Sequence, residues 1–558
     1  MLCAWNGIFF RCAALILALG LSLTAQDPSA QDKNTTHKAD GQKESPAPPP
    51  PDSITDAIVT VAGKALAYRA VAGTITVAAT DQQDALLSLD GKRLPDTGEK
   101  PLDPEKPEEA PPTAQMFYAA YFLKGAPSES RPVTFFYNGG PGSSTMWLHM
   151  GSFGPRRVVT ADTQHATAAP YKIANNDYSL LDVTDLVFID APGTGFSRMA
   201  GKEKEKAFWG TDQDAHAFER FIRRFLSKHE RWNSPKYLFG ESYGTPRSAV
   251  LSAMLQGIDL NGIVLLSAIL SFDNSVDSPR WNPGVDQAYA LALPTYAASA
   301  FYHHKLPNQP PSLEPFLAEV EKYALGDYMH ALLEGSELPD AQKNAAAAKL
   351  HDYTGLPVAY FLKSNLRVSG GAFSKNLQDP EGLTTGRLDT RYQGPDLNPL
   401  SEEAQYDPQS VAISSAYTAA INQYMRTDLK YGQNRTYKPG AYGDGNFSWD
   451  LRHQAPGGPL ATQSEAGTNV MPDLAHAMKL NPSMKVLLAG GYYDLATPFF
   501  EGIYEMRHLP IPQTLQSNIS YHYYAAGHMI YVNEGILKQF HNDVAAFIRG
   551  TEKGSEGR

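Results

Sequence analysis

The chain has 558 residues, of which 42% are apolar and 19% are charged. This composition provides enough hydrophobic material for a sizeable core and excludes an intrinsically disordered chain, while the length predicts two domains or one domain with a large insertion. The formal net charge is −11 and no basic stripe runs along the sequence, which excludes binding to a nucleic-acid backbone.

Residues 1–25 have the layout of a secretory signal peptide. Arg11 precedes an apolar run at 13–23, and small residues follow it. The run is shorter than the roughly 20 apolar residues of a membrane span, so we expect export with no stable span after cleavage; an uncleaved anchor is the alternative. The only two cysteines, Cys3 and Cys12, lie in this leader. Export without disulfides favours a secreted or periplasmic bacterial protein.

The next segment lacks the material for a core. Residues 26–53 are polar and then rich in proline, which predicts a disordered tether. A strand-like region follows at 54–79, and the acidic, proline-rich residues 95–112 predict a surface loop. The folded core is therefore predicted to begin at residue 54.

Strands and helices alternate after residue 116. Strands are predicted at 132–137, 186–189 and 236–239, and helices at 218–229 and 247–256. This alternation implies a mostly parallel sheet with helices on both faces. Residues 54–270 are thus predicted to form the first part of an α/β core.

The alternation stops after residue 271 and returns with a short apolar strand at 485–489. Helical patterns at 313–333 and 341–350, followed by loops rich in glycine and asparagine, occupy the gap. We therefore predict an inserted cap, or lid, domain at 271–470 and the second part of the core at 471–550.

The sharpest local motif is G-E-S-Y-G at residues 240–244, between a predicted strand and a predicted helix. Glycines on both sides of Ser242 allow a tight strand-to-helix turn that exposes its hydroxyl, as a nucleophile elbow requires; a simple turn is the alternative. A serine nucleophile needs a base and an acid later in the chain. Asp494 and His528 follow in the expected order. Taken alone, an aspartate more often caps a helix and a histidine more often lies on a surface loop, so neither residue identifies a site by itself.

A glycine-rich loop, N-G-G-P-G-S-S at residues 138–144, directly follows the strand predicted at 132–137. Its backbone can approach a substrate carbonyl closely, so the N–H groups of Gly140 and Tyr243 are candidates for an oxyanion hole. A phosphate cradle is the alternative. The loop lacks the Lys-Ser/Thr ending of a P-loop and the spacing of a dinucleotide site.

These motifs together resemble the serine carboxypeptidase family of α/β hydrolases. The resemblance is carried, in the family's order, by residues 138–144 with Gly154-Pro155, residues 187–197, residues 240–244, Asp494 and residues 527–529. It implies an α/β-hydrolase fold, a mostly parallel sheet with a large inserted cap. It also implies an exported serine carboxypeptidase that releases C-terminal amino acids through a triad of Ser242, His528 and Asp494.

The resemblance also implies how the substrate is recognised. Asn138, Gly139 and Glu241 match the positions that bind the free C-terminal carboxylate of a peptide. A glutamate must be protonated to donate a hydrogen bond to a carboxylate. An Asx-turn for Asn138 and a solvated side chain for Glu241 are the alternatives.

Three positions depart from the family's pattern: Phe136 stands where tryptophan is common, Ser143 where cysteine is common, and Ser152 where an acidic residue is common. Loss of that acid puts a strongly acidic optimum in doubt. The missing cysteines remove the disulfides usual in eukaryotic members and indicate a bacterial branch.

Two other functions stay open: a related esterase or acyltransferase, and a non-catalytic exported binding protein. No H-E-x-x-H motif occurs, and His303-His304 is the only close histidine pair, so no metal and no cofactor are predicted. The expected partner is a peptide or small molecule with a free carboxylate. The oligomeric state and the preferred side chains are not readable from the sequence.

Overall fold

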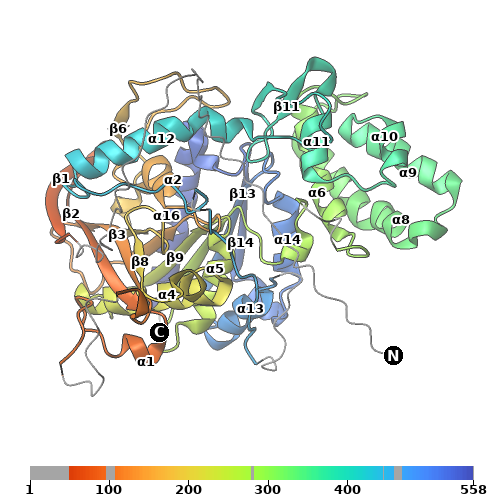
Figure 1. Cartoon of the computed structure of the whole chain (residues 1–558). Helices are drawn as coiled ribbons and strands as arrows, with labels where there is room; N and C mark the ends of the chain where they lie inside the picture. The colour runs from red at the N-terminus through yellow and green to blue at the C-terminus, as the bar shows by residue number, and fades with distance from the viewer. Residues whose placement is uncertain are drawn as a thin grey trace, which may run out of the picture.

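The protein is built around one large sheet, whose strands Figure 1 shows spread across the main body, from β1 and β2 on the left to β13 and β14 near its centre. The structure, a computed structural model, describes residues 50–95, 107–277, 279, 282–443, 445–457 and 468–556. Within them, nine strands of the ten-stranded sheet run in the order β1-β2-β3-β7-β4-β9-β10-β13-β14, and β8 pairs with β3. The predicted signal peptide and residues 26–49 of the predicted tether lie outside the described residues.

Six adjacent strands of this sheet are parallel. They are β7 (Asp185–Ile189), β4 (Val133–Tyr137), β9 (Lys236–Glu241), β10 (Gly262–Leu266), β13 (Lys485–Gly491) and β14 (Ile519–Tyr524). Every residue of β4, β7, β9 and β10 is buried, because helices cover both faces of the parallel part. The other four strands of the sheet pair antiparallel with their neighbours. They are β1 (Ser53–Val61), β2 (Lys64–Ala78), β3 (Thr113–Leu123) and β8 (Arg198–Ala200).

Amphipathic helices form the two outer layers. On one face lie α4 (Thr211–Lys228), α5 (Gly244–Met254) and α13 (Met471–Leu480); on the other lie α16 (Glu534–Glu556) and α12 (Pro408–Thr427). In α4, Phe218, Phe221 and Phe225 recur at helical spacing and are buried against the sheet. Two hydrophobic cores therefore sandwich the sheet, as in the α/β-hydrolase fold that the sequence predicted.

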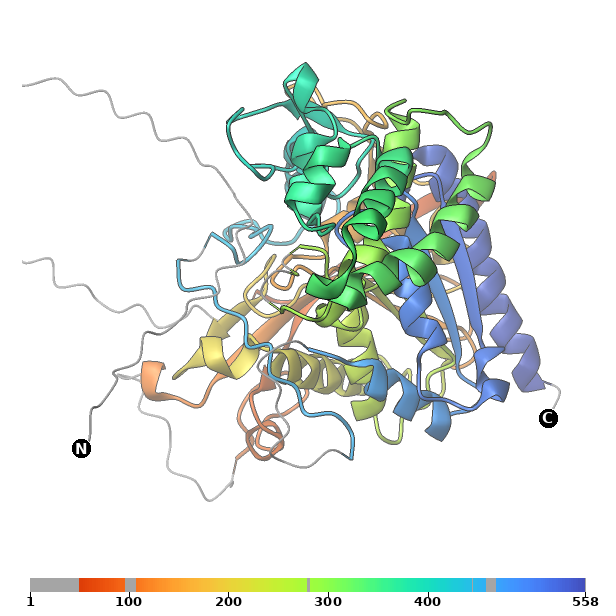
Figure 2. The ribbon, with the colours of Figure 1, turned by 90° about the vertical axis from the view of Figure 1, so that its right-hand side faces the viewer.

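A separate helical lobe lies beside the sheet (Figures 1 and 2). It comprises α6 (Gln287–Tyr302), α7 (Leu313–Tyr323), α8 (Met329–Glu334), α9 (Asp340–Thr354), α10 (Val358–Lys363) and α11 (Gly370–Asn376). Its own hydrophobic core runs from Val276 to Leu377 and reaches the main body through Phe499 and Phe500 of α14 (Phe499–Arg507). We call this lobe the cap.

The predicted insertion at 271–470 is not one structural unit. Helix α12 falls inside that range, where the sequence suggested loops, yet its Ile413, Tyr417 and Ile421 belong to a core of the main body. Figure 1 shows α12 over the main body, apart from the cap helices. The cap core therefore ends near residue 377, and helix α12 of the predicted insertion packs on the main body.

The remaining helices and strands are short. They are α1 (Asp81–Asp84), α2 (Met146–Leu148), α3 (Lys204–Phe208), α15 (Gln513–Gln516), β5 (Arg156–Val158), β6 (Ile173–Asn175), β11 (Leu383–Thr385) and β12 (Gln393–Pro395). Among the described residues, no helix has the length and apolar character needed to cross a membrane.

Candidate active site

Ser242 occupies the turn between β9 and α5. Its φ of +59° lies in the left-handed region, which is costly for a serine and is typical of a nucleophile elbow. The turn is tight enough that a Cβ on Gly240 would collide with the Gly244 carbonyl oxygen. A Cβ on Gly244 would lie 2.8 Å from the Tyr137 carbonyl oxygen of β4, so close backbone contacts favour glycine at both positions. The turn directs Ser242 to the carboxyl edge of the sheet.

Asp494 and His528 meet at the same edge. Asp494 follows β13 and is fully buried, and His528 follows β14 and is 4% exposed. His528 Nδ1 lies 2.8 Å from Asp494 Oδ2. Asp494 also accepts hydrogen bonds from the Ala496 and Thr497 backbone and from the Thr497 hydroxyl, at 2.8–3.0 Å. These donors hold the carboxylate facing the imidazole.

The end of β10 and the residue after it contact both Ser242 and His528. The Ser242 N–H donates to Leu266 O at 2.9 Å, and Ser267 Oγ donates to His528 O at 2.8 Å. No protein hydrogen bond of the Ser242 hydroxyl or of His528 Nε2 is found among the described residues. Apo active sites often leave this pair unbonded until the substrate is bound.

The electrostatics of His528 follow from its neighbours. Burial lowers the pKa of an imidazole, but the Asp494 carboxylate and its hydrogen bond outweigh burial, and the pKa of His528 is raised above its usual value. Glu241 acts in the same direction. The site therefore favours the imidazolium that forms when a histidine accepts a proton.

The glycine loop lies against the start of α5. A Cβ on Gly139 would collide with the Tyr243 nitrogen. In the described part of the chain, neither the Gly140 N–H nor the Tyr243 N–H donates a hydrogen bond to the protein. Two free backbone donors therefore flank the position of Ser242.

Glu241 is a buried carboxyl beside the nucleophile position, 2% exposed. Its Oε1 accepts a hydrogen bond from the Tyr531 hydroxyl at 3.1 Å, and its Oε2 is buried without a partner in the described chain. Burial raises the pKa of Glu241 to about 7, against the opposing effects of His528, Tyr531 and Asn138. This carboxyl therefore holds its proton to higher pH than an ordinary glutamate does. The solvated side chain that we kept as the alternative is wrong.

Sequence reasoning missed Tyr531. The family pattern places an acidic residue at position 152, where this chain has Ser152. The Ser152 hydroxyl donates a hydrogen bond to Leu148 O at 2.6 Å within a helical turn. Tyr531 comes three residues after His528, and no motif marked it. Asn138 Oδ1 accepts from the Leu148 N–H at 3.0 Å, ten residues ahead, so its side chain bonds across the loop rather than in a local Asx-turn.

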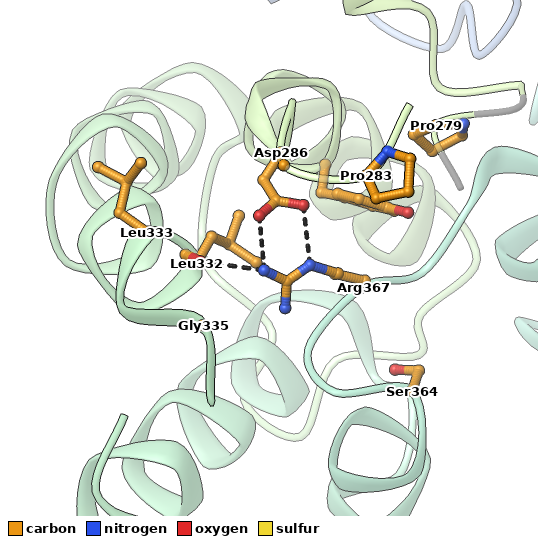
Figure 3. A pocket seen from close by; sticks show the side chains of 10 residues that line it. Pro279, Pro283, Asp286, Leu332, Leu333, Gly335, Ser364 and Arg367 are labelled. Atoms are coloured by element: carbon orange, nitrogen blue, oxygen red, sulfur yellow. Dashed lines mark hydrogen bonds and ion pairs between the residues drawn. The ribbon is translucent and has the colours of Figure 1, made fainter. Parts of the chain in front are cut away.

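A cavity of the cap lies away from these residues. It has a volume of about 570 Å³ and lies in the cap, lined by residues such as Tyr289, Leu332 and Ser364 (Figure 3). An ion pair between Asp286 and Arg367, with hydrogen bonds of 2.8 and 2.5 Å, spans its wall. None of Ser242, Asp494 and His528 lines it.

The sheet order, the elbow and the two side chains at the ends of β13 and β14 define an α/β hydrolase with a serine at the nucleophile position. Residues 108–269 match the family model described as serine carboxypeptidase. The chain is 30% identical over 167 residues to a carboxypeptidase Y homolog of Arthroderma benhamiae, covering 28% of this chain and 31% of that protein. It is 28% identical over 197 residues to serine carboxypeptidase-like 50 of Arabidopsis thaliana, covering 32% of this chain and 42% of that protein.

These matches are to serine carboxypeptidases of the peptidase S10 family, and each covers about a third of the chain or less. The matched stretch spans less than half of either relative. Both relatives are eukaryotic, so they do not support the bacterial branch that the sequence suggested. The chain is also similar in structure to a prohormone-processing carboxypeptidase of Saccharomyces cerevisiae, with 16% identity, 85% of this chain and 91% of that protein covered, and a TM-score of 0.45.

Proposed function

We propose that this protein is a serine-type carboxypeptidase that releases the C-terminal amino acid of a peptide. The observation that carries the proposal is the hydrogen bond between His528 and Asp494 at the edge of the sheet where the β9–α5 turn places Ser242. The buried carboxyl of Glu241 beside the serine adds a group suited to a substrate's free carboxylate.

The chemistry proceeds through an acyl-enzyme. Ser242 Oγ attacks the scissile carbonyl while His528 Nε2 takes its proton, and Asp494 holds the imidazole and stabilises its charged form. The N–H groups of Gly140 and Tyr243 stabilise the oxyanion. The C–N bond then breaks, His528 returns the proton to the leaving amine, and water repeats the sequence to release the acyl group.

The free carboxylate of the substrate is bound by Glu241 in its protonated form, together with Asn138 and Gly139. Two observations support this role: one Glu241 oxygen has no hydrogen-bond partner in the part of the chain that the structure describes, and the pKa of Glu241 is raised to about 7. A protonated carboxyl donates to a carboxylate, whereas an ionised one repels it.

The test is to incubate the purified protein with N-blocked dipeptides as free acids, amides and esters, and to follow amino acid release by mass spectrometry. We expect release from the free acids, and loss of about 10⁴-fold or more in Ser242→Ala, because triad members act as a unit. A fluorophosphonate should label the native protein and not Ser242→Ala. Cleavage of esters without cleavage of free-acid dipeptides would replace the proposal with an esterase or acyltransferase.

We also propose that the protein is exported. The support is the signal-peptide layout of residues 1–25. Expression with and without residues 1–25, followed by cell fractionation, tests this point: retention of both forms inside the cell would contradict it.

A further inference from the structure

A segment between the end of α12 and the start of α13 runs across the glycine loop, and the chemistry above does not use it. We call residues 437–443 and 445–453 the strap. Backbone hydrogen bonds attach the strap to the loop: Ser144 N–H donates to Pro439 O at 2.9 Å, and Ala441 N–H donates to Gly142 O at 2.8 Å. A segment some 300 residues away in sequence is thus paired directly with the loop.

Two aromatic side chains of the strap fill the space that side chains on the glycine loop would occupy. A Cβ on Gly140 would collide with the Tyr442 hydroxyl, and a Cβ on Gly142 would lie 2.7 Å from the Phe447 ring. The two rings pack edge to face, with centroids 5.4 Å apart. Tyr442 and Phe447 therefore cover the outer side of Gly140 and Gly142.

Other contacts fix where the strap lies. Trp449 packs against Tyr243, with ring centroids 5.1 Å apart. The Thr211 N–H donates to Asp450 O at 2.9 Å. His453 lies between two carboxylates, Asp212 at 2.6 Å and Asp473 at 2.8 Å. The strap is thereby attached to α4 and α13, elements of the rigid core.

The glycine loop needs such support. Gly140 and Gly142 adopt φ values of +110° and +88°, and glycines without side chains have much freedom to leave such conformations. Oxyanion stabilisation requires donors preorganised at about 3 Å from the oxyanion, and a misplacement of about 1 Å is costly. A loop of this kind gains its precision from the residues packed around it.

We propose that Tyr442 and Phe447 are positioning residues that hold Gly140–Gly142 so that the Gly140 N–H faces the oxyanion. The inference rests on the proposed function and deepens it. The strap, at the end of the predicted insertion, would then affect kcat rather than the binding of substrate.

The test compares Phe447→Ala, Phe447→Leu and Tyr442→Phe with the native chain. Phe447→Ala should lower kcat about 10–100-fold with KM within threefold, because the lost contact matters in the transition state. Phe447→Leu, which keeps most of the volume, should recover to within about threefold. Tyr442→Phe loses only the hydroxyl against Gly140 and should cost about 3–10-fold in kcat. Leu451→Ala, on the same strap but 39% exposed, is the matched control and should stay at the native rate.

The second readout is the rate constant for labelling of Ser242 by a small fluorophosphonate, which depends on the oxyanion hole but not on peptide recognition. It should fall in parallel with kcat. Native labelling rates in Phe447→Ala or Tyr442→Phe would overturn the role of that residue, and a raised KM with unchanged kcat would assign it to substrate binding instead. If Phe447→Ala does not fold, the kcat and labelling rates of Phe447→Leu and Tyr442→Phe test the proposal. If the native protein labels but releases no amino acid, the carboxypeptidase proposal fails while the labelling comparison still tests the strap.

Discussion

At the scale of single residues, the two buried carboxyl groups of the site differ in the hydrogen bonds that they accept. In the described part of the chain, Asp494 accepts hydrogen bonds on both oxygens, whereas Glu241 accepts them on one. Each Asp494 oxygen accepts hydrogen bonds, from backbone N–H groups, the Thr497 hydroxyl or His528. Glu241 accepts a hydrogen bond from Tyr531 on one oxygen, and its other oxygen is buried without a hydrogen-bond partner among the described residues. For Glu241, burial with few donors raises the pKa to about 7.

The fixed carboxylate gives a first prediction. Asp494→Asn should lower kcat about 10⁴-fold, because an amide favours the wrong tautomer of His528 while leaving the fold intact. His528→Ala should resemble Ser242→Ala. Asp543→Asn is a matched control, since Asp543 also faces a histidine, His522, at 3.4 Å in a half-exposed position. Near-native turnover in Asp494→Asn would remove Asp494 from the site.

The second prediction concerns Glu241. Below pH about 7 its carboxyl is protonated and donates to the substrate, so KM for free-acid dipeptides should rise as pH climbs through about 7. Glu241→Gln keeps a neutral donor and should flatten this dependence with kcat largely preserved. Glu241→Ala should raise KM at every pH.

Peptide amides serve as the control for this titration, because they carry no carboxylate and should lack the trend in KM. They also report the ionisation of His528 separately. A Glu241→Gln profile that follows the native one from mildly acidic to mildly alkaline pH would exclude Glu241 from recognition and strengthen the esterase alternative.

At the scale of elements, His453 attaches the strap to the core through two carboxylates. Burial lowers the pKa of His453, but hydrogen bonds and charge interactions with Asp212 and Asp473 outweigh it and raise the pKa to about 9. Because the folded pKa is higher than the unfolded value of about 6.5, the stabilisation is complete below that value and is lost as pH rises through about 9.

A third prediction follows for alkaline conditions. The fluorescence of Trp449, four residues from the anchor, should change between about pH 8 and pH 10 as the strap loosens. His453→Gln should shift this change to lower pH or show the loosened signal throughout, and its Ser242 labelling should fall. A native-like signal in His453→Gln across this range would contradict the anchoring role. Trp449→Phe identifies the signal's source among the six tryptophans.

At the scale of the whole molecule, the junction between sheet and cap contains a buried acid. Glu501, at the start of α14, is fully buried with both carboxyl oxygens unpartnered in the described chain. Burial raises its pKa well above the usual value, and Glu505, Asp277 and Asp494 act in the same direction. The folded state therefore binds a proton there that the unfolded state releases above pH about 4.5, so stability declines as pH rises through that range.

The fourth prediction is that Glu501→Gln reduces this decline. It should raise Tm at pH 8 by about 1–3 °C relative to the native chain, since about 1 kcal/mol corresponds to about 1 °C in a chain of this size, with little effect at pH 5. Glu337→Gln removes the same charge at an exposed position of the cap and should leave Tm unchanged. An equal shift in Tm in both variants would show that the effect comes from the change in net charge and not from the burial of Glu501.

Much of the fold was readable because its signals are local. The strands at 132–137 and 236–239 are continuous apolar runs, and they appear as β4 and β9 within a residue or two. Helix α4 begins seven residues earlier than predicted, because its first two turns carry charged residues outside the apolar pattern. Helix α12 was missed, since its apolar residues face a core whose other members are far away in sequence.

The sequence by itself determined the elbow around Ser242, the order of the three candidate catalytic residues and the glycine loop, because each depends on a few adjacent residues and on the strand before it. Only the tertiary structure decided that Tyr531 bonds Glu241, 290 residues away, that α12 belongs to the main body, and that the strap covers Gly140. Those contacts join segments whose pairing depends on the packing of the whole chain, which no local pattern of side chains encodes.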